Sequence, residues 1–175
     1  MGRATMAALL IAAGILGGCG LSLPAKQIAS GEIDGIHWTY SVSIRDNRVC
    51  DSIMLDDGAQ AGGRCGGGGG GGPFGISGDI WPGCSTGGGL PTFAYGRVRG
   101  IDRVRVSTNS GSYDANALAP PDDRYQSSFF VIAMPAGVVC QQFLALAPDG
   151  SILSVVAPDS PEIRPSPTLD ASPGA

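Results

Sequence analysis

The chain has 175 residues and a formal net charge of −4, and charged residues make up 15% of it. This length fits one domain, and the acidic balance argues against a general nucleic-acid-binding protein. The low charge and the 29 glycines exclude a coiled coil, and the single histidine excludes sites built from several histidines. We expect no metal, no cofactor, no nucleic-acid partner and a monomeric chain.

The first eighteen residues have the composition of an export signal. Met1-Gly2-Arg3 is a short basic start, and residues 4–18 are uncharged and mostly apolar. A basic start followed by about 7–15 apolar residues is typical of a secretory signal peptide, whereas about 20 apolar residues are needed to span a bilayer. We therefore predict a signal peptide over residues 1–18.

The apolar segment ends in Leu16-Gly17-Gly18-Cys19, which resembles the lipobox of bacterial lipoproteins. That motif has an aliphatic residue, two small residues and then a cysteine. The resemblance implies cleavage before Cys19 and lipidation of its sulfur with acyl chains such as palmitate, which would anchor the chain to the outer face of the bacterial plasma membrane. A cleaved signal peptide with an incidental cysteine and an uncleaved membrane helix remain as alternatives.

Four cysteines remain once Cys19 is set aside: Cys50, Cys65, Cys84 and Cys140. An even number of cysteines in an exported domain predicts two disulfides, with three possible pairings. We favour Cys50–Cys65, which would close a hairpin, and Cys84–Cys140, which would join a glycine-rich loop to a strand. A zinc site is the alternative, but the spacing lacks any C-x-x-C pair.

The residues that follow the signal peptide have the alternation of a β domain. Residues 36–45 alternate apolar and polar side chains at a strict period of two, which is typical of a half-buried strand. Asp46-Asn47 predicts a turn, and residues 49–55 predict a second strand. We expect residues 19–27 to be a tether, whose extended part reaches at most about 29 Å from the membrane.

Glycine dominates the middle of the chain. Half of residues 58–89 are glycine, including an unbroken run at 66–72. Because glycine has no side chain to bury, we predict that residues 58–91 form a long loop, with a short strand near Arg64-Cys65 as the alternative. The run satisfies G-x-G-x-x-G, but no Gly-Lys-Ser/Thr follows it and no β-α unit surrounds it, so we do not expect a phosphate-binding loop.

Further strands are predicted on the C-terminal side of this loop, and Asp149-Gly150 between apolar residues is a strong hairpin signal. Seven or eight short strands without a convincing helix predict an all-β fold. We expect a two-sheet immunoglobulin-like sandwich over residues 28–157. Residues 158–175, which are rich in proline and serine, are expected to form a disordered tail.

One motif and one histidine are candidates for catalytic chemistry. Gly83-Cys84-Ser85-Thr86-Gly87 matches the G-x-S-x-G nucleophile elbow, which needs a strand before the serine and a helix after it. Glycines and a proline follow instead. The single histidine, His37, lies upstream on the polar face of its strand, where a solvated histidine is expected. We predict no catalytic residues, and a small extracytoplasmic hydrolase is the alternative function.

Four arginines within nine residues share one parity: Arg97, Arg99, Arg103 and Arg105. On an unbroken strand they would line one sheet face, where they would meet anionic lipid, wall polymers or an acidic membrane protein. The alternative is a solvated face whose arginines pair with carboxylates across the strands. A bulge or turn at Gly100 would also break the parity.

Beyond the lipobox, the chain resembles small exported β domains of high-GC bacteria. The segments that carry this resemblance are Asp34-Gly35-Ile36-His37-Trp38, Arg103-Val104-Arg105-Val106, Phe129-Phe130-Val131 and Pro148-Asp149-Gly150. The resemblance implies export and a β fold but no activity. Together, these patterns predict a lipid-anchored extracytoplasmic module with a binding or structural role.

Overall fold

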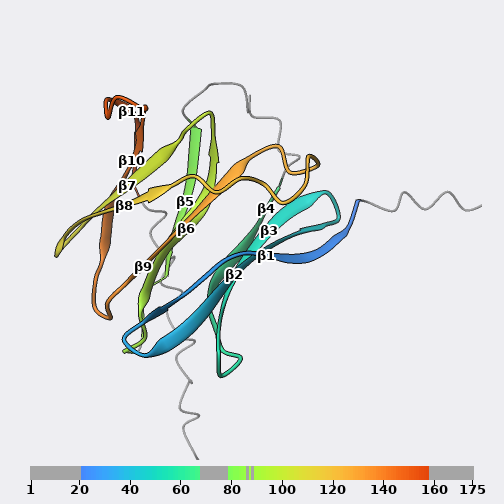
Figure 1. The fold of residues 1–175 in the computed structure, drawn as a ribbon, viewed down its shortest axis with the longest axis horizontal. Coiled ribbons are helices and arrows are strands. Elements are labelled where there is room, and N and C mark those ends of the chain that lie inside the picture. Colours follow the sequence, from blue (N-terminus) through green and yellow to red (C-terminus); the bar gives the residue numbers. More distant parts are fainter. Residues whose placement is uncertain (1–20, 68–78, 86, 88, 158–175) are drawn as a thin grey trace, which may run out of the picture.

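The computed structural model describes residues 21–67, 79–85, 87 and 89–157. The predicted signal peptide, Cys19 and the predicted tail at 158–175 lie outside the described residues. All helices and strands found in the described part of the chain are β-strands, which confirms the predicted all-β class. Eleven strands form three antiparallel sheets (Figure 1).

Each sheet has a simple strand order. The N-terminal sheet has the order β1-β2-β3-β4, with the bounds Leu23–Ile33, Ile36–Arg45, Arg48–Leu55 and Gln60–Gly67. The middle sheet has the order β5-β6-β9, with the bounds Asp79–Ser85, Thr92–Arg99 and Ser128–Met134. The C-terminal sheet has the order β11-β10-β7-β8, and its strands span Ile152–Val156, Cys140–Leu146, Arg103–Thr108 and Gly111–Asn116.

The middle sheet is covered on both faces by the other two sheets (Figure 1). Because side chains alternate along a strand, β6 contributes Phe93 and Tyr95 to the cluster shared with the N-terminal sheet. Its Ala94 and Val98 belong to the cluster shared with the C-terminal sheet. β6 is accordingly buried without a break from Thr92 to Val98.

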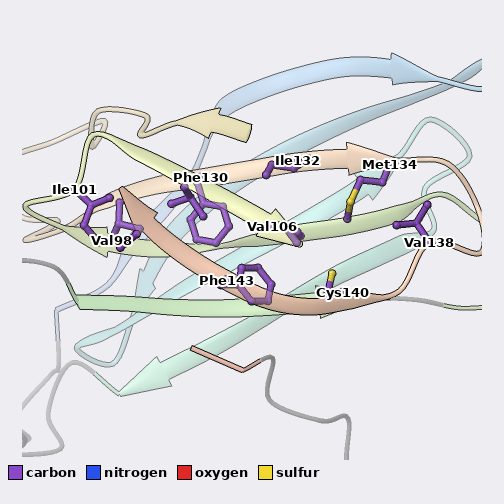
Figure 2. Close-up of a cluster of buried hydrophobic side chains, with 12 residues drawn as sticks. Val98, Ile101, Val106, Phe130, Ile132, Met134, Val138, Cys140 and Phe143 are labelled. Atoms are coloured by element: carbon purple, nitrogen blue, oxygen red, sulfur yellow. The ribbon is translucent and has the colours of Figure 1, made fainter. Parts of the chain in front are cut away.

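Each cluster contains a pair of aromatic side chains that meet edge-on. Between the N-terminal and middle sheets, the ring centroids of Trp38 and Phe93 lie 5.8 Å apart in an edge-on arrangement. Between the middle and C-terminal sheets, the ring centroids of Phe130 and Phe143 lie 6.1 Å apart in the same arrangement. Figure 2 shows the two side chains within their cluster. Buried aromatic pairs of this geometry are favourable beyond the apolar area that they remove from water.

The number of sheets differs from the predicted two-sheet immunoglobulin-like sandwich, because the described residues form three sheets. The chain crosses from the middle sheet to the C-terminal sheet between β6 and β7, at Gly100, whose φ is 61°. An alternating pattern shows that a strand has two faces, but it does not show which sheet the strand joins. β6 and β7, which follow each other in the sequence, therefore belong to different sheets.

Two segments that were expected to lack regular structure contain strands. β1 begins at Leu23, inside the predicted tether, and pairs with β2 as far as Ile33. β4 and β5 lie inside the predicted glycine-rich loop. In each case the strand is formed by backbone hydrogen bonds to a strongly alternating neighbour, which need no apolar side chain on the added strand.

The two disulfides have the favoured pairing. Cys50 and Cys65 lie directly opposite each other on β3 and β4, with their Cα atoms 4.0 Å apart. Cys84 on β5 is joined to Cys140 on β10, so this bond links the middle sheet to the C-terminal sheet. The second disulfide thus connects two layers that are otherwise held together by side-chain packing.

Removing the inter-sheet disulfide should cost more stability than removing the hairpin disulfide. The residue pairs lie 56 and 15 positions apart in the sequence. In the chain-entropy model, replacing both cysteines by alanine should lower the free energy of unfolding by about 4 kcal/mol for Cys84–Cys140 and about 3 kcal/mol for Cys50–Cys65. Denaturant unfolding of the two variants measures this. A larger loss for the hairpin pair would contradict the expectation.

Candidate functional site: an arginine-lined pocket

A pocket of about 160 Å³ opens at the end of the molecule where β2 turns into β3. It collects side chains from the N-terminal sheet, from the end of β6 and from the loop before β9. Its described lining residues are Leu21, Ile44, Asn47, Val49, Arg97, Arg99, Arg124, Gln126 and Ser127. This lining combines an apolar wall, three guanidinium groups and three uncharged polar side chains, and no acid is among these residues.

Two of the arginines come from the same face of β6. Arg97 and Arg99 are two residues apart, so both side chains point to the side of the N-terminal sheet. Arg97 is only 7% exposed. Gly66 on β4 makes room for it, because a Cβ atom at that position would collide with the Arg97 Nη2 atom.

The third arginine, Arg124, lies in the loop between β8 and β9 and is held by Asp122. Its Nε and Nη2 atoms donate to the two carboxylate oxygens of Asp122 at 2.6 and 2.5 Å. These hydrogen bonds hold the pKa of Asp122 well below its ordinary value. The neighbouring Tyr125 is buried, and its hydroxyl donates to the carbonyl of Val42 at 3.4 Å, which fixes the loop to β2.

The turn between β2 and β3 supplies Asn47 to the pocket lining. Asp46 and Asn47 both have positive φ values, 50° and 63°, as a two-residue hairpin turn requires. The Asn47 side-chain oxygen accepts a hydrogen bond from the amide of Leu21 at 2.7 Å, and the Asn47 amide donates to the Leu21 carbonyl at 3.0 Å. Ser22 Oγ accepts from the Asp46 amide at 3.2 Å. The turn therefore clamps the first described residues against the pocket.

Behind the pocket lies a buried polar cluster around Asp51. Asp51 Oδ1 accepts from the Arg64 amide at 3.0 Å, and Oδ2 accepts from the Tyr40 hydroxyl at 3.5 Å. The Arg64 Nη1 atom donates to the carbonyl of Pro82 at 2.8 Å, which ties β4 to β5. The hydroxyl of Tyr95 accepts from the Gly63 amide at 2.9 Å. The cluster therefore connects the N-terminal sheet with the middle sheet.

Burial controls the protonation of this cluster. It raises the pKa of Asp51 above its ordinary value, although the charges of Arg64 and Arg97 act in the opposite direction. Burial also lowers the pKa of Arg97, and the nearby charge of Arg64 adds to that decrease. The pKa of Tyr40 is raised well above its ordinary value by burial and by Asp51. Arg97 belongs both to this cluster and to the pocket lining.

The structure divides the predicted arginine stripe into two halves. Arg97 and Arg99 lie on the middle sheet, whereas Arg103 and Arg105 lie on β7 of the C-terminal sheet. The backbone at Gly100 turns between them with positive φ. Arg105 forms two hydrogen bonds with Asp114 across β7 and β8, at 2.7 and 2.8 Å. The turn at Gly100, which the sequence analysis gave as an alternative, separates the two halves, and only the first half reaches the pocket.

Several residues of the site were missed by the sequence analysis, among them Arg124 and Asp51. Arg124 lies in a loop, where no period indicates the direction of a side chain. Asp51 did carry a signal, because it lies at the same parity as Val49 and Ile53 and so belongs to the inward face of β3. An acid at such a position indicates a buried polar site.

The residues considered for catalysis do not meet in the pocket. His37 is exposed on β2, and its Nδ1 atom lies 3.6 Å from a carboxylate oxygen of Glu32. Ser85 ends β5, and its hydroxyl oxygen is buried without a hydrogen-bond partner among the described residues. Within the described ranges no group of three or more histidines, cysteines or acids is arranged to hold a metal ion. Nor does that part of the chain contain a helix long and apolar enough to cross a bilayer.

Comparison with family models, curated proteins and solved structures gave no match for the chain.

Substituting Gly83 should destabilise the contact between β5 and Tyr95. A Cβ atom at position 83 would lie 2.9 Å from the Tyr95 ring, so the Gly83→Ala variant should lose about 1–3 kcal/mol of unfolding free energy through overpacking. Gly87→Ala is the matched control, because nothing lies within 4 Å of a Cβ there. Thermal or denaturant unfolding compares them, and equal losses would contradict the close packing of Tyr95 on β5.

The Asp51→Asn variant should change the pH dependence of stability. A raised pKa in the folded state means that the native protein loses stability as the pH rises from about 4 through the folded-state pKa of Asp51. Relative to the Asp51→Asn variant, the unmodified chain should therefore lose about 1.4 kcal/mol of unfolding free energy for each unit by which folding raises the pKa of Asp51. Unfolding from pH 3 to pH 8 measures this difference. Asp123→Asn, at an exposed position, is the control, and a difference that grows in the opposite direction would refute the expectation.

Proposed function

We propose that the chain is an extracytoplasmic binding module, held at the outer face of a bacterial plasma membrane by a lipid on Cys19. The disulfides carry this proposal. They use four of the five cysteines in the sequence, and disulfides of this kind form and persist in oxidising compartments. The fifth is the cysteine of the lipobox-like motif, which is left available for lipidation.

The pocket supports a binding role within this proposal. Guanidinium groups recognise planar or multiply charged oxygen acceptors, such as carboxylates and phosphates, by paired hydrogen bonds. Three arginines line one small hollow here, and Asp122 orients one of them. The module thus binds an anionic group through Arg97, Arg99 and Arg124.

Intact-mass measurement of protein extracted from membranes tests the anchor. The mature chain should begin at Cys19 and carry the added mass of a diacylglyceryl group with its acyl chains, and a Cys19→Ser variant should lack that mass and leave the membrane fraction. The same sample should gain four mass units on reduction, one pair for each disulfide. An unmodified Cys19, or a mature chain that begins elsewhere, would contradict the proposal.

A further inference from the structure

The pocket lies next to the point at which the lipid would be attached. Leu21 lines the pocket and is held there by two hydrogen bonds to Asn47. Cys19 precedes Leu21 by two residues, and covalent geometry limits two residues to a span of about 7 Å. The long tether expected from the sequence is therefore replaced by a very short one, because the chain is part of the fold from Leu21 onward.

The same end of the molecule carries further positive charge. Arg45 and Arg48 flank the Asp46–Asn47 turn, are both exposed, and lie directly opposite each other on β2 and β3. Neither forms an ion pair with a described residue, and like charges placed opposite each other are unfavourable in an isolated sheet. Together with Arg97, Arg99 and Arg124 they form what we call the basic end.

Acids also lie at the basic end, and Asp79 is directly opposite Arg99 in the register of β5 and β6. Asp46 is an exposed turn residue. Asp122 is shared between Arg124 and Lys26, whose Nζ atom lies 4.0 Å from the carboxylate. Asp51 lies deeper, in the buried cluster. The charge of the basic end contrasts with the net charge of −4 for the whole chain.

We propose that the pocket takes the phosphoryl group of a phospholipid headgroup in the membrane to which the chain is anchored. This inference rests on the proposed lipid on Cys19, which would place the pocket at the membrane surface. Guanidinium groups bind phosphate by paired, charge-assisted hydrogen bonds, and every phospholipid headgroup presents a phosphate at the membrane surface. The apolar wall of Leu21, Ile44 and Val49 suits the glycerol and first methylene groups beside that phosphate.

Arg124 is prepared for this role by its pairing with Asp122. A guanidinium group has five N–H donors, and the carboxylate occupies Nε and Nη2. The Nη1 atom retains two donors for a ligand while the side chain is already oriented. Anionic phospholipids attract clusters of arginine near the surface, so Arg45 and Arg48 would strengthen the contact without entering the pocket.

Calorimetric titration tests the ligand chemistry. The protein is extracted in an uncharged detergent and titrated with sn-glycerol 3-phosphate as the soluble probe, with acetate as the carboxylate reference. We expect saturable binding of glycerol phosphate that is at least tenfold tighter than that of acetate. Arg99→Gln and Arg124→Gln should each weaken it at least tenfold. Arg105→Gln, on the C-terminal sheet, is the matched control and should bind like the unmodified protein. Thermal unfolding confirms that the variants fold, and Arg124→Gln carries the test if Arg99→Gln does not fold.

Hydrogen exchange in bilayers tests the source of the phosphate. Amides of the Asp46–Asn47 turn and of residues 122–127 should exchange at least fivefold more slowly in bilayers with phosphatidylglycerol than in uncharged detergent. Arg124→Gln should remove most of this protection, and Arg105→Gln should keep it.

The outcomes separate this inference from the proposed function. Tight binding of acetate alone would overturn the phosphoryl assignment and leave the binding module intact. Glycerol phosphate binding without protection in bilayers, or protection by purified wall polymer instead, would overturn the membrane source. An unmodified Cys19 would overturn the anchor, and the headgroup assignment would fall with it. Absence of any anion binding would refute the pocket's role outright.

Discussion

Burial of the middle sheet on both faces is the constraint on which the rest of the structure depends. β6 must fill two interfaces at once, and it does so with small or apolar side chains toward one layer and with Tyr95 and Arg97 toward the other. Those two large side chains occupy space that opposing strands would otherwise fill. Gly62, Gly66 and Gly83 are the positions where β4 and β5 yield that space. Glycine is thus a packing requirement at these three positions, because a Cβ atom there would come too close to Tyr95 or Arg97.

The polar interior follows from the same geometry. Asp51 and Arg97 lie at inward positions of facing strands, where burial makes every charge costly unless it is paired. Hydrogen bonds from Arg64 and Tyr40 to Asp51, all within the N-terminal sheet, reduce that cost. Arg64 and Tyr40 also donate to the carbonyls of Pro82 and Gly96, which joins this sheet to the middle sheet. Arg97 extends from this cluster into the pocket lining, so occupation of the pocket and packing between the sheets involve one shared side chain.

Much of the fold was predictable where side chains carry the signal. The alternation of residues 36–45 coincides with β2, and both cysteine pairs were those favoured. β1 and β5 were not predicted, and β4 was considered only as a short strand near Arg64-Cys65. Backbone pairing with a neighbour forms these strands, and their own side chains show little period. The arginine stripe is interrupted at Gly100, where a turn takes the chain from the middle sheet to the C-terminal sheet. Two of the three arginines of the pocket were therefore foreseeable from β6, while the loop that supplies Arg124 was not.

The hydrogen bonds between Asn47 and Leu21 hold the fold close to the proposed point of lipid attachment. If Cys19 carries an acyl chain as proposed, the link between membrane and fold would be too short for the domain to tumble freely, and the anchor would fix orientation as well as location. Binding of a lipid headgroup in the pocket would then be an intramolecular event, and a short linker would give the headgroup a millimolar effective concentration at the pocket. A pocket whose affinity for a free phosphate ester is weak would still be occupied at the surface, and shedding of the anchored segment would release the domain from its ligand and its membrane in one step.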